Sequence, residues 1–449
     1  MIAKKNIFNV FIIFLISHLV VWTLIPTLSN DNLPLDTIEA LAWGSNMDWG
    51  FNKHPPLSAL AVEIIYFIFG SQDWAYYLLS QFFVIISFIY VWKFSEEIFE
   101  DKIYSLLSLF VLEGIYFYNY TSPEFNVNVC QLPFCALTVY YFWKSINTNK
   151  NINWLLFAVF SALGFLSKYL FIYLLLAIFI YFCFYFKKND KFFYHYVISI
   201  FISIMLLIPH FNWLIENNFI TIFYGFNRTG LSESNLVNHI YNPTIFILKQ
   251  IGILIPVYVM VFFLVKKIKF KIDLKNKKTL FLLSINIIPF ILILITTLIT
   301  GAKIRTMWMT PFYLFFGILI IYIFKKNILI ANLKKFYMTF LFFFILSPAI
   351  YLSVSLSDDT KRTDYPGKEI ARLVQNKWND NFLNEIKIVV GDEWSAGNLS
   401  YHLNSRPIWM NSLKNKTSDV KPDQGVIYVG RPEILKKICP GVYGTIRPV

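Results

Sequence analysis

Apolar residues form long, nearly uninterrupted runs along most of the chain, separated by short polar connections. About 20 helical residues cross the hydrocarbon core of a bilayer, so each long run is a candidate membrane-spanning helix. The fold class predicted from this pattern is a mainly α, polytopic membrane protein with about eleven spans. The predicted spans cover residues 7–26, 74–94, 103–118, 126–143, 152–166, 169–186, 193–213, 244–265, 279–299, 306–324 and 336–354.

The pattern changes after the last predicted span. Pro, Gly, Asn, Asp and Lys return there, and short β-like runs at 386–390 and 425–429 alternate with a helix-like segment at 367–378. We therefore expect a transmembrane domain at residues 1–354 and a small soluble α/β domain at residues 355–449. Cys439 is the only cysteine of this second part, so no intramolecular disulfide can form within it.

Composition and charge exclude a soluble protein and give an orientation. The chain is 57% hydrophobic and only 15% charged, whereas soluble domains carry about 25% charged residues. Lys and Arg number 40 against 27 Asp and Glu, and the lysines gather in every second connection, which is typical of cytoplasmic loops. This dispersal argues against a nucleic-acid-binding surface. The basic connections contain Lys4 and Lys5, Lys144 and Lys150, Lys187, Lys188 and Lys191, the run 266–278, and Lys325, Lys326, Lys334 and Lys335.

This orientation predicts a cytoplasmic N-terminus, a multi-pass protein of the cytoplasmic (inner) membrane, and an extracytoplasmic, periplasmic second domain. Residues 27–58 form a long outer loop that is aromatic and carries both signs of charge. Loops of this length are usually functional, so we expect a site on the outer membrane face that is supplied with lipid substrates. Within the following segment, residues 57–70 are predicted to form an amphipathic helix at the outer interface.

At this loop the chain resembles the GT-C membrane glycosyltransferases, namely the protein O-mannosyltransferase-like family 39 and the aminoarabinose transferases that modify lipid A. The segment 36–57 follows the form of the first outer loop of these proteins, ending in Lys53-His54-Pro55-Pro56-Leu57. Two departures are Thr37 where many relatives have Glu, and Lys53 where some have Asp. Further agreements lie at residues 166–169, 209–218, 301–311 and 391–399.

The resemblance implies a sugar donor carried on a polyprenyl phosphate, membrane lipids around it, and a lipid or glycan acceptor. A carboxylate would then activate the acceptor hydroxyl, and Asp36 matches the position of the family's catalytic aspartate. The alternative from the residues alone is that Asp36 caps the helix-compatible run 37–44, with Glu39 at the capping-box position. Glu39 is also a possible second acid of the site.

Cations are expected to neutralise the leaving phosphate. Lys53 and His54 stand before a rigid Pro-Pro pair and are candidates for this role; the alternatives are snorkelling for Lys53 and a structural hydrogen bond for His54. His54 could also hold a divalent metal ion with Asp36 or Glu39, which leaves a metal cofactor possible. The other candidates for phosphate binding are Lys168, which interrupts an apolar stretch, and Lys303, Arg305 and Arg228 in outer loops.

Glu124 follows Ser122 and Pro123 at the outer start of a predicted span. It is a second candidate catalytic residue, although Ser-Pro-Glu is also typical of a helix N-terminus. The predicted function is transfer of a sugar from a polyprenyl-phosphate carrier to lipid A or to another envelope glycan or protein. The alternative is a non-catalytic transporter of lipid-linked glycans or an envelope assembly protein.

Overall fold

The computed structural model describes residues 4–185, 191–230, 235–268, 272–358, 360–411, 424–431 and 433. Lys187, Lys188 and Cys439, which entered the sequence analysis, lie outside these ranges.

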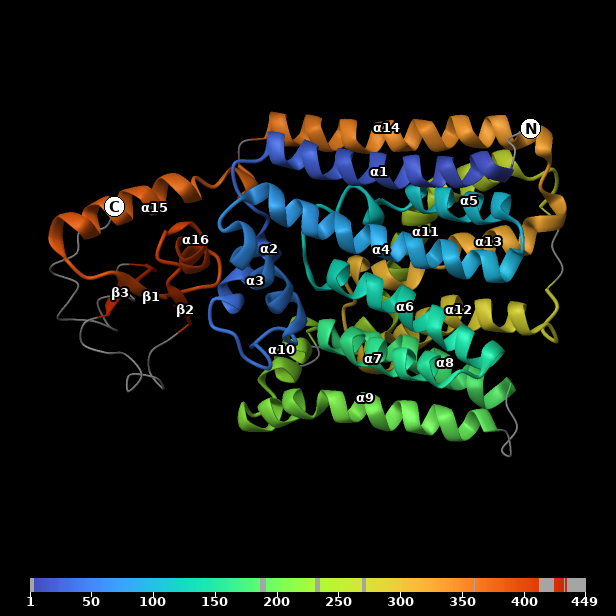
Figure 1. Ribbon diagram of the computed structural model, residues 1–449, viewed down its shortest axis with the longest axis horizontal. Helices are drawn as coiled ribbons and strands as arrows, with labels where there is room; N and C mark the ends of the chain where they lie inside the picture. The colour runs from blue at the N-terminus through green and yellow to red at the C-terminus, as the bar shows by residue number, and fades with distance from the viewer. Residues whose placement is uncertain are drawn as a thin grey trace.

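Long apolar helices run side by side along the body of the protein (Figure 1). Six of those described are long and apolar enough to cross a membrane, and seven if a pair bent by 58° at residues 306–327 counts as one span. The predicted class, a mainly α multi-pass membrane protein, is thereby confirmed, while the count of eleven spans remains a prediction. The six are α1 (Lys4–Ser29), α4 (Asp73–Phe99), α9 (Lys191–Glu216), α11 (Asn238–Leu264), α12 (Lys277–Thr300) and α14 (Leu333–Ser357).

Shorter helices fill the space between the long ones (Figure 1). They are α5 (Lys102–Phe110), α6 (Val127–Thr148), α7 (Asn151–Ser167), α8 (Ile172–Tyr185), α10 (Ile220–Arg228) and α13 (Phe316–Phe324), with 3₁₀ turns η1 (Val111–Gly114), η2 (Tyr116–Tyr118), η3 (Tyr169–Phe171), η5 (Thr306–Tyr313), η6 (Lys325–Asn327) and η7 (Ile330–Asn332). The break predicted near Lys168 is present, because that residue has extended backbone between α7 and η3.

The predicted span 103–118 is not one continuous helix. It changes to 3₁₀ turns after Phe110, and these turns bury Glu113 in the bundle. Its carboxylate accepts hydrogen bonds from the His18 imidazole of α1, at 2.8 Å, and from the Asn119 amide, at 3.3 Å. A buried carboxylate requires such partners, and the turns bring Asn119 back to supply one of them.

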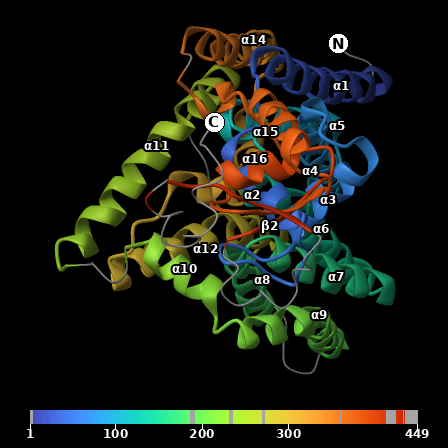
Figure 2. The same ribbon diagram turned by 90° about the vertical axis from the view of Figure 1, so that its left-hand side faces the viewer.

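One end of the bundle carries two short helices and a small α/β unit (Figures 1 and 2). The short helices are α2 (Leu35–Gly44) and α3 (Leu57–Phe69), the latter close to the predicted interfacial helix. The α/β unit contains a parallel sheet with strand order β2-β1-β3. Its elements are η8 (Arg362–Asp364), α15 (Gly367–Asn381), β1 (Ile386–Val390), α16 (Ser395–His402), β2 (Ile408–Met410) and β3 (Gly425–Tyr428).

The α/β unit packs directly on α2 and α3. A Cβ at Gly397 of α16 would approach the side chain of Ala42 to 3.1 Å, so the two helices touch closely. The Arg406 guanidinium donates to the Glu63 carboxylate of α3 at 2.6 Å and to the Leu41 carbonyl of α2 at 2.7 Å. The outer loop is therefore held between the bundle and this unit.

Candidate functional site

Asp36 lies in the first turn of α2 and does not cap it. The residue at the N-cap position is Pro34, and no side chain makes a capping hydrogen bond there. The capping interpretations of Asp36 and Glu39 are therefore wrong. The Asp36 carboxylate is left half-buried and available for chemistry.

Glu124 provides the acceptor at this helix end. Its Oε1 accepts a hydrogen bond from the backbone N–H of Asp36 at 3.1 Å. The helix-start interpretation of Glu124 is also wrong, because Asn126 caps α6 by accepting from the N–H groups of Asn128 and Val129. Burial, with the nearby Asp36, raises the pKa of Glu124 to about 8. The charges of the two carboxyl groups therefore influence each other.

Four cationic side chains lie close enough to Asp36 to act on its charge. Burial raises the pKa of Asp36, and the positive charges of Lys168, Lys53, Arg228 and Arg305 oppose that rise. The structure therefore brings together six of the residues singled out in the sequence, namely Asp36, Glu124, Lys53, Lys168, Arg228 and Arg305. Lys303 is exposed and is not among the charges that shift Asp36.

Lys168 is held at the break between α7 and η3. Its ammonium donates to the Asn128 side-chain oxygen at 2.5 Å and lies 5.1 Å from the centre of the Trp308 ring. Burial lowers the pKa of Lys168 to about 7, with the attraction of Asp36 opposing this fall and Arg305 adding to it. Asn128 and Trp308 were not singled out from the sequence, because neither carries a charge that marks it locally.

Arg228 ends α10 and Arg305 directly precedes η5, and the two segments are hydrogen-bonded to each other just beyond these residues. The N–H of Lys303 donates to the Thr229 carbonyl at 2.9 Å, which fixes the end of α10 beside the segment before η5. Within the described ranges, neither guanidinium forms an ion pair with a carboxylate. Both are therefore free to meet an anion.

Lys53, by contrast, is already paired. Its Nζ lies 2.8 Å from the Glu39 carboxylate and 3.3 Å from the Glu393 carboxylate, and the Asn52 amide also donates to Glu393. Glu39 is thus a partner of Lys53. Glu393 belongs to the segment 391–399 that carries part of the family resemblance, but nothing in its local pattern marked it as a site residue.

His54 is uncharged at neutral pH. Burial and the positive charges of Lys168, Lys53 and Arg228 lower its pKa to about 3. Its ring lies edge-on to Trp43 and Tyr224, at centroid distances of 5.9 and 6.3 Å. His54 can therefore donate or accept a hydrogen bond, but it adds no positive charge for a phosphate.

The outer loop is anchored by α9 and α10. The His210 imidazole hydrogen-bonds the Trp49 carbonyl at 2.6 Å, and the Thr221 hydroxyl donates to the Phe51 carbonyl at 2.6 Å. Gly50 between them lies against the Trp213 ring, which a Cβ there would approach to 2.4 Å. These contacts explain why a glycine and an aromatic-rich sequence precede Lys53.

Two further features bear on ligands. In the parts of the chain that the structure describes, no group of three or more His, Cys, Asp or Glu side chains is arranged to bind a metal ion. A cavity of about 320 Å³ opens beside Glu124, between the last residues of α1 and α14. Tyr120, Tyr351, Lys361 and Arg362 line it as well. Glu124 thus faces this cavity while it contacts Asp36.

Comparisons with known proteins agree with the resemblance seen in the sequence. Residues 53–213 match the family model described as dolichyl-phosphate-mannose-protein mannosyltransferase. The crystal structure of ArnT from Cupriavidus metallidurans bound to undecaprenyl phosphate matches with a TM-score of 0.65 and 10% identity, over 97% of this chain and 95% of that chain. Its apo state matches with a TM-score of 0.59 and 10% identity, over 98% and 89%. No curated protein sequence matches significantly. The predicted GT-C fold is confirmed.

Proposed function

We propose that this protein is a glycosyltransferase that moves a sugar from a polyprenyl-phosphate carrier to an acceptor at the outer face of the membrane. The observation that carries the proposal is the Asp36 and Glu124 pair, with Lys168, Arg228 and Arg305 close enough to act on the charge of Asp36. The GT-C fold and the undecaprenyl phosphate in the ArnT crystal structure support the choice of donor.

In the proposed reaction, an acceptor hydroxyl attacks the anomeric carbon of the donor sugar. A new bond forms between that carbon and the acceptor oxygen, and the bond to the phosphate oxygen breaks. The Asp36 carboxylate takes the hydroxyl proton, as a general base within hydrogen-bonding reach would. The polyprenyl phosphate leaves with the bonding electrons.

The cations stabilise that departure. Negative charge grows on the phosphate oxygen in the transition state, and pre-positioned cations lower its energy without rearranging. Arg228 and Arg305 suit this role because guanidinium groups bind phosphate through two parallel hydrogen bonds. Lys168 contributes a compact charge that depends on its protonation.

We assign the acceptor to the cavity beside Glu124. Its lining combines apolar surface with the cationic residues Lys361 and Arg362, which fits a phosphorylated lipid such as lipid A, or another envelope glycan. We place the protein in the inner membrane with the N-terminus in the cytoplasm, on the basis of the lysine distribution. The proposed division is a catalytic transmembrane domain at 1–354 and a periplasmic domain at 355–449.

The test is a reconstituted transfer assay in proteoliposomes. Polyprenyl-phosphate-linked aminoarabinose and mannose are offered as donors with purified lipid A as acceptor, and products are identified by mass. Transfer of either sugar by the wild type supports the proposal. Donor that is bound but neither transferred nor hydrolysed, together with its movement across the bilayer, would instead identify a transporter.

A further inference from the structure

We propose that a groove between α11, α12 and α13 binds an anionic phospholipid in the leaflet opposite the candidate site. The groove encloses a cavity of about 830 Å³, and every residue that lines it is aliphatic or aromatic. Ile255, Val259 and Phe262 come from α11, Ile287 from α12, and Phe316 and Ile320 from α13. The volume lies within the usual range for pockets that bind small molecules.

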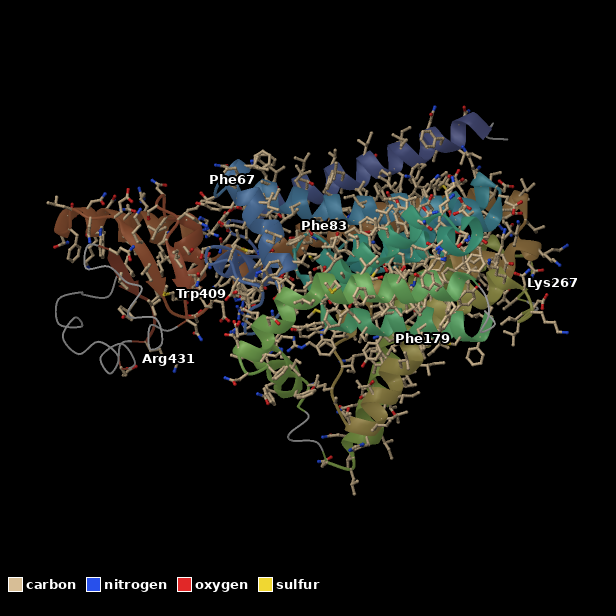
Figure 3. All side chains as sticks on the ribbon, turned by 60° about the horizontal axis from the view of Figure 1, so that its bottom comes forward. Phe67, Phe83, Phe179, Lys267, Trp409 and Arg431 are labelled. Atoms are coloured by element: carbon tan, nitrogen blue, oxygen red, sulfur yellow. The ribbon has the colours of Figure 1, made fainter. Side chains whose placement is uncertain are left out.

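The groove lies at the end of the bundle remote from Asp36. Its lining includes Val265, at the end of α11, and Phe324, at the end of α13. Figure 3 shows Lys267 at this end, far from Trp409 of the α/β unit. Several apolar side chains of the groove are open to the surroundings, among them Phe262, which is 63% exposed.

Cations border the mouth of the groove. Val265 and Ile328 form an antiparallel bridge, and the N–H of Lys266 donates to the Asn327 carbonyl at 2.9 Å. These contacts place the start of the run 266–278 beside η6. That run contains seven lysines and one aspartate. In the described part of the chain, no carboxylate pairs with Lys266, Lys267 or Lys326.

An apolar cavity with unpaired cations at its mouth complements one class of molecule. Apolar chains fill the groove, and a phosphate headgroup neutralises the lysines, as in basic pockets between transmembrane helices that bind anionic lipids. A zwitterionic lipid would gain less from the same lysines. A polyprenyl chain could fill the groove, but the proposed donor site holds its phosphate at the other end of the bundle. The phospholipid assignment is independent of the transferase proposal.

The test measures lipid retention by native mass spectrometry, with full-length protein reconstituted in vesicles of diphosphatidylglycerol and phosphatidylcholine. The wild type is expected to retain diphosphatidylglycerol selectively. The paired substitution Lys266→Gln with Lys267→Gln should weaken retention about 25-fold, since each lysine near a membrane surface contributes a factor of about five to binding of anionic lipid. The matched control, Lys93→Gln with Lys150→Gln, removes two lysines elsewhere at this end and should retain the lipid.

A second pair of variants tests the apolar part. Ile287→Trp fills the groove and should also lower retention, whereas Ile295→Trp lies outside it on the same helix and should not. Equal loss in both lysine pairs, equal retention of phosphatidylcholine by the wild type, or recovery of a polyprenyl phosphate in place of the phospholipid would each overturn the proposal. The lipid-selectivity measurement on the wild type needs no variant, so it decides the matter even where a variant does not fold.

Discussion

The backbone N–H of Asp36 donates a hydrogen bond to the Glu124 carboxylate across 3.1 Å, although the two residues are 88 positions apart in the chain. The contact joins the first turn of α2 to the loop before α6. Because the amide is satisfied by Glu124, the Asp36 side chain has no capping role and can point its charge at a substrate.

Replacing Asp36 with Asn should lower kcat by about 10²–10⁴-fold, because a positioned general base contributes that much to proton transfer. Donor binding and membrane insertion should persist, since the substitution keeps the shape of the side chain. The assay is transfer in proteoliposomes at saturating donor. Asp48→Asn is the control, because Asp48 is an exposed carboxylate of the same outer loop. Wild-type turnover by Asp36→Asn would remove Asp36 from the mechanism.

Replacing Arg305 with Ala should raise KM for the lipid donor about tenfold, the effect of losing one hydrogen bond to a charged group. Lys303→Ala is the matched control, since Lys303 is an exposed cation of the same loop and is not among the main charges acting on the Asp36 carboxyl. Equal KM values for the two variants would show that Arg305 does not meet the phosphate. The measurement is a donor titration at a fixed acceptor concentration.

Lys53→Ala should lower the free energy of unfolding by about 1–3 kcal/mol, because it leaves two half-buried carboxylates without their cation. Adding Glu39→Gln and Glu393→Gln should recover much of this loss, since no orphan charge then remains. Thermal unfolding of the single and triple variants in detergent measures both. The sequence-based phosphate role of Lys53 stays a prediction, and an unchanged donor KM in the triple variant would refute it.

Stability should fall with rising pH because of Glu124. Its folded-state pKa of about 8 exceeds the ordinary value of 4.5. Between these two pH values the native state therefore keeps a proton that the unfolded state has already released. The stability from this protonated carboxyl is fully present below pH 4.5 and is lost as the pH rises through about 8. Asp36 and Glu39 enhance the shift, and the Asp36 N–H and the Asn126 side chain oppose it.

Glu124→Gln tests this pH dependence. The melting temperature of the variant minus that of the wild type should increase from pH 5 to pH 9, because glutamine has no proton to lose. Exposed Glu369 offers the control, and Glu369→Gln should track the wild type across the range. A constant difference between Glu124→Gln and the wild type would contradict the assigned proton.

Sequence patterns predicted best those elements that depend on residues close together in the chain. Apolar periodicity and length located the long helices, and β1 coincides with the predicted run 386–390. The break at Lys168 was also visible, because a single charge in an apolar stretch cannot be buried in a straight helix without partners. The 3₁₀ turns after Phe110 were missed, because they depend on His18 and Asn119 meeting Glu113.

The sequence by itself determined that this chain is membrane-embedded, and it predicted a site from the acidic and basic residues gathered in the segment 27–58. The length of the apolar runs and the positions of the lysines can be read along the chain, so these two conclusions require no knowledge of tertiary contacts. Only the tertiary structure decided which charges act together. It paired Lys53 with Glu39 and Glu393, left Arg228 and Arg305 unpaired in the described ranges, and joined Glu124 to Asp36. These outcomes depend on distances between residues far apart in the chain, and local sequence patterns contain no information on such distances.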